Sequence, residues 1–405
     1  MTSPPLTIAF IYDDESPWQH LGLISDQTDH NFKGIAAVLE ALGHQVIHID
    51  GIRDLVSHLA NRNHTRWDLA FNIAEGMYGL AREAQVPCLL EAYGIPFTLA
   101  DAATTSLCLD KGRTKMVLQH LGIHTAPFAI IPTGPTNDVT FPNRDLMIER
   151  AIGNSRHVEG LQQYPLFAKP IGEGTSKGIL PCSKITKRED LALTVGKLSA
   201  LYGNQDILLE PFLSGREITV GILGAGEDAR VIGANEYVYK SPPQPFQGDG
   251  EDDTLLNFAS DHVKNAPMDT NPHMTVRSAN LADPQVHNAC QLALAAWKAL
   301  GCRDAGRIDT RFDRMGEAGL PCVLEVNPIP GILPDWSDLA IIATSNGFSY
   351  EGFLNEIVNS ALKRGASRRP RCDINQYGSN GDGKDAVSEP VVTRRDRWEK
   401  YNLRT

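Results

Sequence analysis

The chain has 405 residues, of which 42% are hydrophobic and 21% are charged, and its net charge at pH 7 is −11. This composition is typical of a globular protein and excludes a mainly disordered chain. The acidic balance argues against nucleic acid as the main partner. No apolar run approaches the roughly 20 residues that span a bilayer, so no membrane partner is expected.

The cysteines and the N-terminus indicate the cellular compartment. The seven cysteines are scattered, odd in number and free of any C-x-x-C pair, which is typical of reduced thiols in a protein core. Residues 1–5 show no basic stretch followed by an apolar run, so no signal peptide is predicted. We therefore expect a cytoplasmic protein without a zinc site.

The first hundred residues alternate between predicted strands and helices. Strands are predicted at 6–12, 45–49, 68–74 and 95–98 from their β-branched and aromatic content. Apolar residues recur at helical spacing from Phe32 to Leu42, where Gly43 ends the helix, and a second helix is predicted from Arg82 to Tyr93. This rhythm predicts an α/β fold with a parallel sheet covered by helices.

Further units are predicted downstream of this N-terminal α/β substrate domain at 1–105. The unit at 106–205 has a helix from Lys111 to Leu121 and a glycine-rich loop at 172–178. The unit at 206–365 is rich in strands and has a helix that starts at Asp283-Pro284, an N-cap followed by proline at the first helical position.

Two segments are predicted to be flexible. Residues 242–275 are rich in Pro, Gly, Asp and Asn and show almost no periodicity, which indicates a long mobile loop. Residues 366–405 are polar and have little apolar content to pack, which indicates a flexible tail.

Two glycine patterns point to other enzyme classes but lack the required context. Gly174–Gly178 matches the nucleophile elbow G-x-S-x-G, but the following residues are strand-like and include a proline, whereas the motif needs a helix. Gly221–Gly226 follows a strand as a dinucleotide loop would, but its glycines are in the wrong order, so a β-hairpin is predicted.

The strongest chemical signal is a predicted hairpin near the end of the third unit. Period-2 alternation puts Arg307, Asp309 and Arg311 on one face of a strand at 306–313. It likewise puts Glu325 and Asn327 on one face of the next strand. These carboxylate and amide oxygens suit Mg²⁺. The alternative is a solvated sheet face with a salt bridge, but the apolar residues Ile308, Leu324 and Val326 alternate with the polar ones.

A second signal comes from lysines and carboxylates near the glycine-rich loop. Lys169 ends an apolar strand just before the loop at 172–178, and such loops let backbone N–H groups approach phosphates. Lys111 adds a cation at a helix start. Glu210 and Glu217 flank a turn, where they suit an adenine amine and ribose hydroxyls or are simply surface carboxylates.

Taken in order, these segments resemble the ATP-grasp superfamily, and more closely its D-alanine–D-alanine ligase branch. The resemblance covers roughly residues 68–365 and rests on the segments Phe71–Pro87, Leu109–Lys111, Ala168–Pro170 with its loop, Glu210–Glu217, Gly306–Asp309 and Leu324–Gly331. It implies an ATP-grasp fold, in which an N-terminal parallel α/β domain (1–105) precedes a central lid subdomain (106–205) and a C-terminal subdomain (206–365) that grip ATP between them.

The resemblance also implies residue roles. ATP would be bound by Lys111, Lys169, Gly174, Thr175, Ser176, Glu210, Leu213, Glu217 and Lys240. Two Mg²⁺ ions, with Mn²⁺ as an alternative, would be bound by Asp309, Glu325 and Asn327. The catalytic residues would be Arg307, the backbone N–H of Gly331, Lys240 at the γ-phosphate, and Thr175 in place of a substrate-side serine. The substrates would meet Glu75, Arg82, Asp335, Trp336 and Ser337. Dimers are common in the family, so a homodimer is one expectation.

The amino-acid side departs from the family pattern. The stretch 13–18 does not match the turn that holds the first amine, Ser241 replaces a tyrosine, and Asp335-Trp336-Ser337 occupies the place of a Ser-Leu pair. We therefore predict an ATP-dependent carboxylate–amine ligase that joins two amino acids, or an amino acid and a small amine, through an acyl phosphate. The alternatives are a D-alanine–D-alanine ligase, a non-catalytic ATP-binding regulator and a carboxyl kinase.

Overall fold

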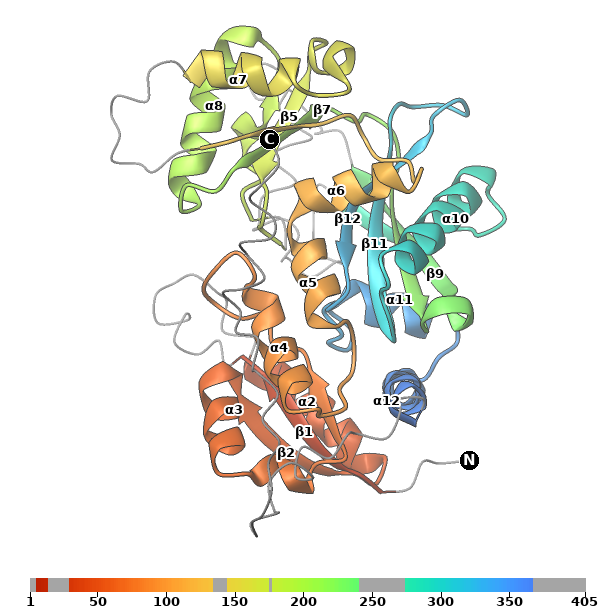
Figure 1. Ribbon diagram of the computed structural model, residues 1–405. Coiled ribbons are helices and arrows are strands. Elements are labelled where there is room, and N and C mark those ends of the chain that lie inside the picture. Colours follow the sequence, from red (N-terminus) through yellow and green to blue (C-terminus); the bar gives the residue numbers. More distant parts are fainter. Residues whose placement is uncertain (1–4, 14–28, 134–143, 175–176, 240–273, 367–405) are drawn as a thin grey trace, which may run out of the picture. The chain divides into compact units, whose positions relative to one another are not determined.

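The computed structural model describes residues 5–13, 29–133, 144–174, 177–239 and 274–366, and these residues form three β-sheets (Figure 1). The predicted flexible segments 242–275 and 366–405 lie outside the described residues except at residues 274, 275 and 366. Residues 274 and 275 begin strand β10, and residue 366 ends helix α12, so both predictions are wrong at these ends.

The N-terminal sheet is parallel, as predicted, with the strand order β2–β1–β3. Its strands are β1 (Thr7–Tyr12), β2 (Gln45–Asp50) and β3 (Leu69–Asn72), and its helices are α2 (Asp29–Ala41), α3 (Gly51–Ala60) and α4 (Gln85–Ala92). Because side chains alternate along a strand, Ile8 and Phe10 pack with α2 whereas Ala9 and Ile11 pack with α3. Burial on both faces explains the continuous apolar run of β1.

Three predicted elements of this region are shorter than expected, the first being the strand predicted at 68–74, which is β3 (Leu69–Asn72). The strand predicted at 95–98 is a single parallel bridge between Phe97 and Ala70. Pro96 has no N–H to donate, and Leu99 has a left-handed φ of 67°, so the pairing stops there. The helix predicted from residue 82 begins with a 3₁₀ turn at Arg82–Ala84 and is α-helical only over α4.

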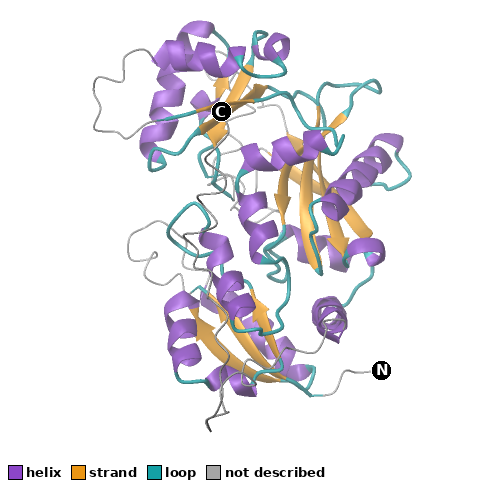
Figure 2. Ribbon diagram, viewed as in Figure 1, coloured by secondary structure: helices purple, strands orange, loops and turns teal. Residues whose placement is uncertain are grey.

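The second sheet is antiparallel and has the order β4–β7–β5–β6. Its elements are β4 (Ala129–Ile131), β5 (Leu166–Pro170), β6 (Lys184–Ile185), β7 (Ile207–Pro211), α7 (Arg144–Gly153) and α8 (Arg188–Leu201), with a 3₁₀ turn at Val158–Leu161. Leu191 and Val195 of α8 pack against Leu166 and Leu209. The helices therefore cover one face of the sheet, which leaves alternate residues such as Lys169 for the other face (Figure 2).

The third sheet is antiparallel, with the order β10–β9–β8–β11–β12. Its strands are β8 (Glu217–Leu223), β9 (Arg230–Tyr239), β10 (Met274–Ser278), β11 (Ala305–Phe312) and β12 (Pro321–Asn327). The associated helices are α5 (Ala102–Leu109), α6 (Lys111–His120), α10 (Pro284–Ala299), α11 (Asp338–Ser345) and α12 (Tyr350–Ala366). The predicted Asp283 cap is confirmed, because its side chain accepts a hydrogen bond from the backbone N–H of Gln285.

Both faces of strand β8 are packed. Ile218, Val220 and Ile222 lie in one core cluster with α10. On the other face, a Cβ atom at Gly221 would come within 2.9 Å of Ile342 in α11, so a residue without a side chain is needed there. The Gly221–Gly226 pattern belongs to the β8–β9 hairpin, as predicted, and not to a dinucleotide loop.

The segment after Gly178 also has the predicted character. It forms a 3₁₀ turn at Pro181–Ser183 and then strand β6, rather than the α-helix that a nucleophile elbow needs. None of the described helices is long and apolar enough to cross a membrane.

The buried carboxylate of Asp304 connects three distant segments. It accepts hydrogen bonds from the backbone N–H of Leu99 at 2.8 Å, from Ser360 at 2.7 Å and from Arg364 at 2.9 Å. Helix α12, which carries Ser360 and Arg364, also shares a hydrophobic cluster with β1 and α2. The end of the described chain therefore packs against its beginning.

Candidate active site

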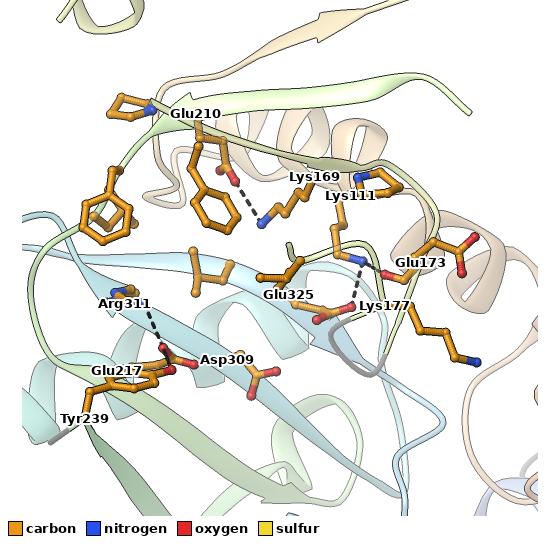
Figure 3. A pocket seen from close by; sticks show the side chains of 17 residues that line it. Lys111, Lys169, Glu173, Lys177, Glu210, Glu217, Tyr239, Asp309, Arg311 and Glu325 are labelled. Atoms are coloured by element: carbon orange, nitrogen blue, oxygen red, sulfur yellow. Dashed lines mark hydrogen bonds and ion pairs between the residues drawn. The ribbon is translucent and has the colours of Figure 1, made fainter. Parts of the chain in front are cut away.

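A cleft lies between the second and third sheets, and its empty volume is about 970 Å³, including the part open to solvent (Figure 3). Its lining comes from helix α6 and from strands of both sheets. The charged and aromatic residues that line it are Lys111, Phe167, Lys169, Glu173, Lys177, Glu210, Phe212, Glu217, Tyr239, Asp309, Arg311 and Glu325. Charges of both signs thus face the same space.

The two lysines predicted to hold phosphates both reach this cleft. Lys111 is the first residue of α6, where Asp110 is the N-cap. The Lys111 ammonium lies 2.8 Å from a carboxylate oxygen of Glu325. Lys169 projects from β5 and lies 2.9 Å from Glu210. Because both cations are largely buried and paired, they are held in place before any ligand arrives.

Glu210 is bracketed by two lysines, one of which sequence reasoning did not single out. Lys115 lies 2.6 Å from one carboxylate oxygen, and Lys169 lies near the other. Burial alone would raise the pKa of Glu210, but Lys115 and then Lys169 overcome it and lower this pKa to about 2. Lys115 follows Lys111 by four residues, so helical spacing was the signal that could have found it.

The predicted carboxylate pair faces across two neighbouring strands. In the β11–β12 ladder, Asp309 lies opposite Glu325 and Arg307 lies opposite Asn327. Asp309 accepts hydrogen bonds from Thr219 at 2.7 Å and from Asn327 at 3.2 Å. Burial would raise the pKa of Glu325, but Lys111 and Arg307 lower it below its ordinary value. Glu325 is therefore held in the charged form, and Asp309 is held in place by its hydrogen bonds.

One detail of the predicted alternation is wrong. A β-bulge interrupts the pairing after Asp309, so that Asp309 pairs with Glu325 but Thr310 pairs with Val323. The extra residue, Leu324, consequently lines the cleft beside Glu325 instead of joining the buried face with Ile308. A bulge changes which residues share a face, and strict alternation cannot anticipate it.

The oxygen atoms at this position suit a magnesium ion. Asp309 and Glu325 supply carboxylates on paired strands, and Asn327 lies close enough to hydrogen-bond Asp309. Within the described residues, no group of three or more His, Cys, Asp or Glu side chains is arranged to hold a metal. Two carboxylates and an amide fit an ion that takes its other ligands from phosphate oxygens and water, as Mg²⁺ does.

Arg307, on β11 next to the Asp309–Glu325 pair, lies between two carboxylates. Its guanidinium is 2.5 Å from Asp309 and 3.9 Å from Asp338, the first residue of α11. The hydroxyl of Tyr237 donates to the other oxygen of Asp338 at 2.6 Å. Burial would lower the pKa of Arg307, but Asp309 and Asp338 raise it above its usual range. Arg307 is therefore a fixed cation, and Asp338 is a contact that sequence reasoning missed.

The opposite end of the cleft has an aromatic and apolar character. Glu217 accepts hydrogen bonds from the Tyr239 hydroxyl at 2.8 Å and from Arg311 at 3.1 Å. The Arg311 guanidinium lies over the rings of Phe212 and Tyr239, in each case 5.6 Å from the ring centroid. Leu213 and Leu324 add apolar surface nearby. Flat, apolar walls with a carboxylate beside them suit a nucleoside.

A second, smaller hollow surrounds Gly331. Asp13 and Glu75 line it together with the apolar residues Phe32, Ile35, Ile73, Ile332 and Leu333. The Asp13 carboxylate accepts hydrogen bonds from the backbone N–H groups of Glu75 and Gly76, both at 2.8 Å. This contact joins the ends of β1 and β3, whose carboxyl ends meet because the strands are parallel.

The other predicted substrate residues do not line this hollow. Arg82 donates to the backbone carbonyl of Gly172 at 3.0 Å, so it supports the glycine-rich loop. The Ser337 hydroxyl accepts a hydrogen bond from the Leu333 backbone N–H at 3.0 Å. Trp336 is 36% exposed, and Asp335 has a left-handed φ of 58°. Of the five residues predicted to meet substrate, only Glu75 lies in the hollow.

Comparison with known proteins establishes the family. Residues 117–359 match the family described as "D-ala D-ala ligase C-terminus". The chain belongs to the D-alanine–D-alanine ligase family. Members of this family are ATP-grasp enzymes that form carbon–nitrogen bonds, so the predicted superfamily and enzyme class are confirmed.

Two relatives and one solved structure show how far the similarity extends. A D-alanine–D-alanine ligase of Rhizorhabdus wittichii is 29% identical over 90% of this chain and 99% of its own. An uncharacterized protein, y4sG, of Sinorhizobium fredii is 27% identical over 86% of this chain and 90% of its own. The Bacillus anthracis D-alanine–D-alanine ligase complexed with ATP has a TM-score of 0.62 at 18% identity, covering 89% and 99% of the chains. The predicted ATP-grasp fold is confirmed.

Some predictions about this family member remain predictions. Lys240, Thr175 and Ser176 lie outside the described residues, whereas Gly174 is described and lies next to Glu173, which lines the cleft. The domain boundaries at 105/106 and 205/206 and the assigned residue roles are likewise untested. Lys177, just after the glycine-rich loop, lines the cleft and was not predicted to do so.

Proposed function

We propose that this family member uses ATP to join the carboxylate of one amino acid to the amine of a second amino acid or of a small amine. The observation that carries the proposal is that Lys111 and Lys169 face the same cleft as Asp309 and Glu325. Cations for phosphates beside oxygen ligands for a metal are the set that phosphoryl transfer needs.

The chemistry follows from the poor reactivity of a carboxylate towards an amine. Transfer of the γ-phosphoryl group to a carboxylate oxygen of the donor releases ADP and makes an acyl phosphate, whose phosphate is a good leaving group. The amine of the acceptor then attacks the acyl carbon, the C–N bond forms, phosphate leaves and the amine loses a proton. Arg307 and the Gly331 backbone N–H would hold the oxygen that becomes negative in this second step.

Other residues would hold the nucleotide. Lys111 and Lys169 would bind its phosphates, together with the glycine-rich loop that contains Gly174, Thr175 and Ser176, and Lys240 would reach the γ-phosphate. Glu210, Leu213 and Glu217 would border the adenine and ribose. Asp309, Glu325 and Asn327 would hold two Mg²⁺ ions, which neutralise phosphate charge when bound.

A second candidate function is D-alanine–D-alanine ligation itself. The names of the Rhizorhabdus and Bacillus proteins favour it. The acceptor side disfavours it, because Trp336 brings a bulky side chain to the segment that follows Gly331.

The proposal also includes a cellular compartment and an oligomeric state. The six described cysteines are free thiols, which supports a reducing compartment such as the cytoplasm. A homodimer is proposed from the resemblance alone, and light scattering coupled to size-exclusion chromatography measures it.

The test is a screen of amino acids in pairs, with both enantiomers of each, for ADP release from ATP and Mg²⁺. Mass spectrometry of the products identifies the bond formed. Amide formation from one pair supports the proposal, and strong preference for D-alanine in both positions identifies the second candidate. ATP binding with no turnover for any pair would favour a regulator, and hydroxamate trapping without amide would favour a carboxyl kinase.

A further inference from the structure

A third hollow lies on a different face of helix α6 from the cleft lysines. It is formed by α6, β4, α7 and residues 154–157, and its empty volume is about 1610 Å³, including the part open to solvent. Its lining includes Met116, Phe128, Met147, Arg150, Arg156 and His157, and we call it the α6–α7 hollow. Helical geometry separates it from the ATP cleft, because Met116 and His120 point away from the side of α6 that carries Lys111 and Lys115.

The titratable side chains that line the α6–α7 hollow are arginines and histidines. Arg150, Arg156, His120 and His157 line it, and no Asp or Glu is present among its described lining residues. This is unusual in a chain whose net charge is −11. Unpaired positive charge concentrated in a concave surface attracts anions.

In helix α7 the acidic side chains are paired outside the hollow, whereas Arg150 lines it. The acidic residues Asp145 and Glu149 contact Arg188 of α8, at 3.0 Å and 3.1 Å. Arg150, on the same helix, and Arg156 form no ion pair with any residue that the structure describes. The two carboxylates that α7 itself carries are therefore paired with Arg188.

The floor of the hollow is apolar, and hydrogen bonds hold the segments that form it together. Phe128 is 8% exposed, and its backbone carbonyl accepts a hydrogen bond from Ser155 at 2.7 Å. The side chains of Gln119 and His157 lie 2.8 Å apart and join α6 to the 154–157 segment. Met116, 52% exposed, adds a flexible apolar wall. The hollow thus combines a fixed apolar surface with cations at its rim.

We infer that the α6–α7 hollow binds a small organic dianion with an aromatic or apolar body. The planar guanidinium fork of arginine matches both phosphate and carboxylate groups, and the two arginines can balance two negative charges. The apolar floor removes the body of such a ligand from water. This site is separate from the proposed ligase chemistry and does not depend on it.

The test is a titration of the full-length protein, with ¹³C-labelled methionine methyl groups, monitored by NMR. The chain has seven methionines, so the Met116 and Met147 signals can be assigned with Met116→Leu and Met147→Leu. The probes are phenyl phosphate, phthalate and inorganic phosphate. We expect phenyl phosphate or phthalate to shift both signals saturably, and the tighter of the two identifies the anionic group. Inorganic phosphate should bind about tenfold more weakly because it has no apolar body.

Two double variants of the hollow and one control double variant make the test specific. Arg150→Ala with Arg156→Ala should weaken binding by about tenfold or more, since two charge-assisted contacts are lost. Arg53→Ala with Arg66→Ala removes two exposed arginines from the N-terminal region and should leave binding unchanged. Arg150→Lys with Arg156→Lys keeps the charge and should bind with intermediate affinity. Unchanged signals of Met116 and Met147, equal binding by the Arg150/Arg156 alanine variant, or equal binding of inorganic phosphate would each overturn the inference.

Discussion

The cleft between the second and third sheets and the hollow around Gly331 differ in the charged residues that line them. In the cleft, Lys111, Lys169 and Arg311 each contact a carboxylate, and the side chains project from strands or from the first residue of a helix. In the Gly331 hollow, Asp13 and Glu75 stand among apolar side chains, and both follow the ends of strands. The first region holds many fixed charges, and the second holds two acids in an apolar surface.

This difference indicates which parts of the site a change of amino-acid preference would alter. Strand pairing determines where Asp309 and Glu325 lie, so the positions of these two carboxylates tolerate little change. Loops accept substitutions more easily and usually carry selectivity. The residues from Gly331 to Asp338 and the loop after β3 are therefore the places where a different amino-acid preference can arise.

The largest expected effect tests the nucleotide side. Glu325→Ala should lower ADP release by about a thousandfold, because it removes a proposed metal ligand and the partner of Lys111, while ATP affinity falls only modestly. A coupled assay of ADP and calorimetry with a non-hydrolysable ATP analogue measure the two quantities. Glu317→Ala changes an exposed glutamate of the same hairpin and should be silent. Near-normal turnover in Glu325→Ala would contradict the metal assignment.

The second prediction concerns Arg307, which contacts Asp309 on β11 and Asp338 in α11. Arg307→Ala should reduce kcat by about a hundredfold with little change in the KM for ATP, because one donor to a developing oxyanion is lost. Steady-state kinetics with the best substrate pair provide both numbers. Arg314→Ala, which removes an exposed arginine just beyond β11, is the control. An Arg307→Ala enzyme that changes only the KM for ATP would place Arg307 with the nucleotide instead.

The third prediction concerns the contribution of the buried Glu210 ion pairs to stability. The Glu210 pKa of about 2 lies below the ordinary value of 4.5, so its ion pairs stabilise the fold above about pH 4.5 and this contribution is lost as the pH falls towards 2. Glu210→Gln should therefore cost about 3 kcal/mol of unfolding free energy at pH 7 and progressively less below pH 4.5. Urea unfolding at several pH values measures this difference.

The control for this stability effect is a glutamate at the surface. Glu227, whose side chain is 97% exposed, contacts Lys298, and Glu227→Gln should change stability by less than about 0.5 kcal/mol at any pH. A Glu210→Gln penalty that is constant between pH 7 and pH 3 would show that the lysine pairs do not hold Glu210 in its charged form.

The smallest effect concerns the amino-acid side. Trp336→Ser should lower the KM of small acceptors such as alanine by about tenfold or less, because a bulky side chain is removed from the segment that follows Gly331. Acceptor profiles measured by ADP release show this change. Trp336→Phe keeps an aromatic ring and should retain the original profile. Identical profiles for Trp336→Ser and the parent would remove Trp336 from the acceptor site.

Local patterns in the sequence were enough to predict much of the fold. Period-2 alternation identified β11 and β12 and the shared face of Arg307 and Asp309, which the ladder confirms. The cap at Asp283-Pro284 and the alternation of strands and helices before residue 95 were also correct. These features depend on neighbours within a few residues, so the sequence contains the necessary information.

Long-range packing decided the rest. The meeting of Glu210 with Lys115, the contact of Asp338 with Arg307 and the place of Asp13 beside Gly331 join segments that are 31 to more than 300 residues apart. The bulge that turns Leu324 into the cleft depends on how β12 pairs with β11. Periodicity reports which face of an element a residue occupies, but only the folded chain determines which other element that face meets.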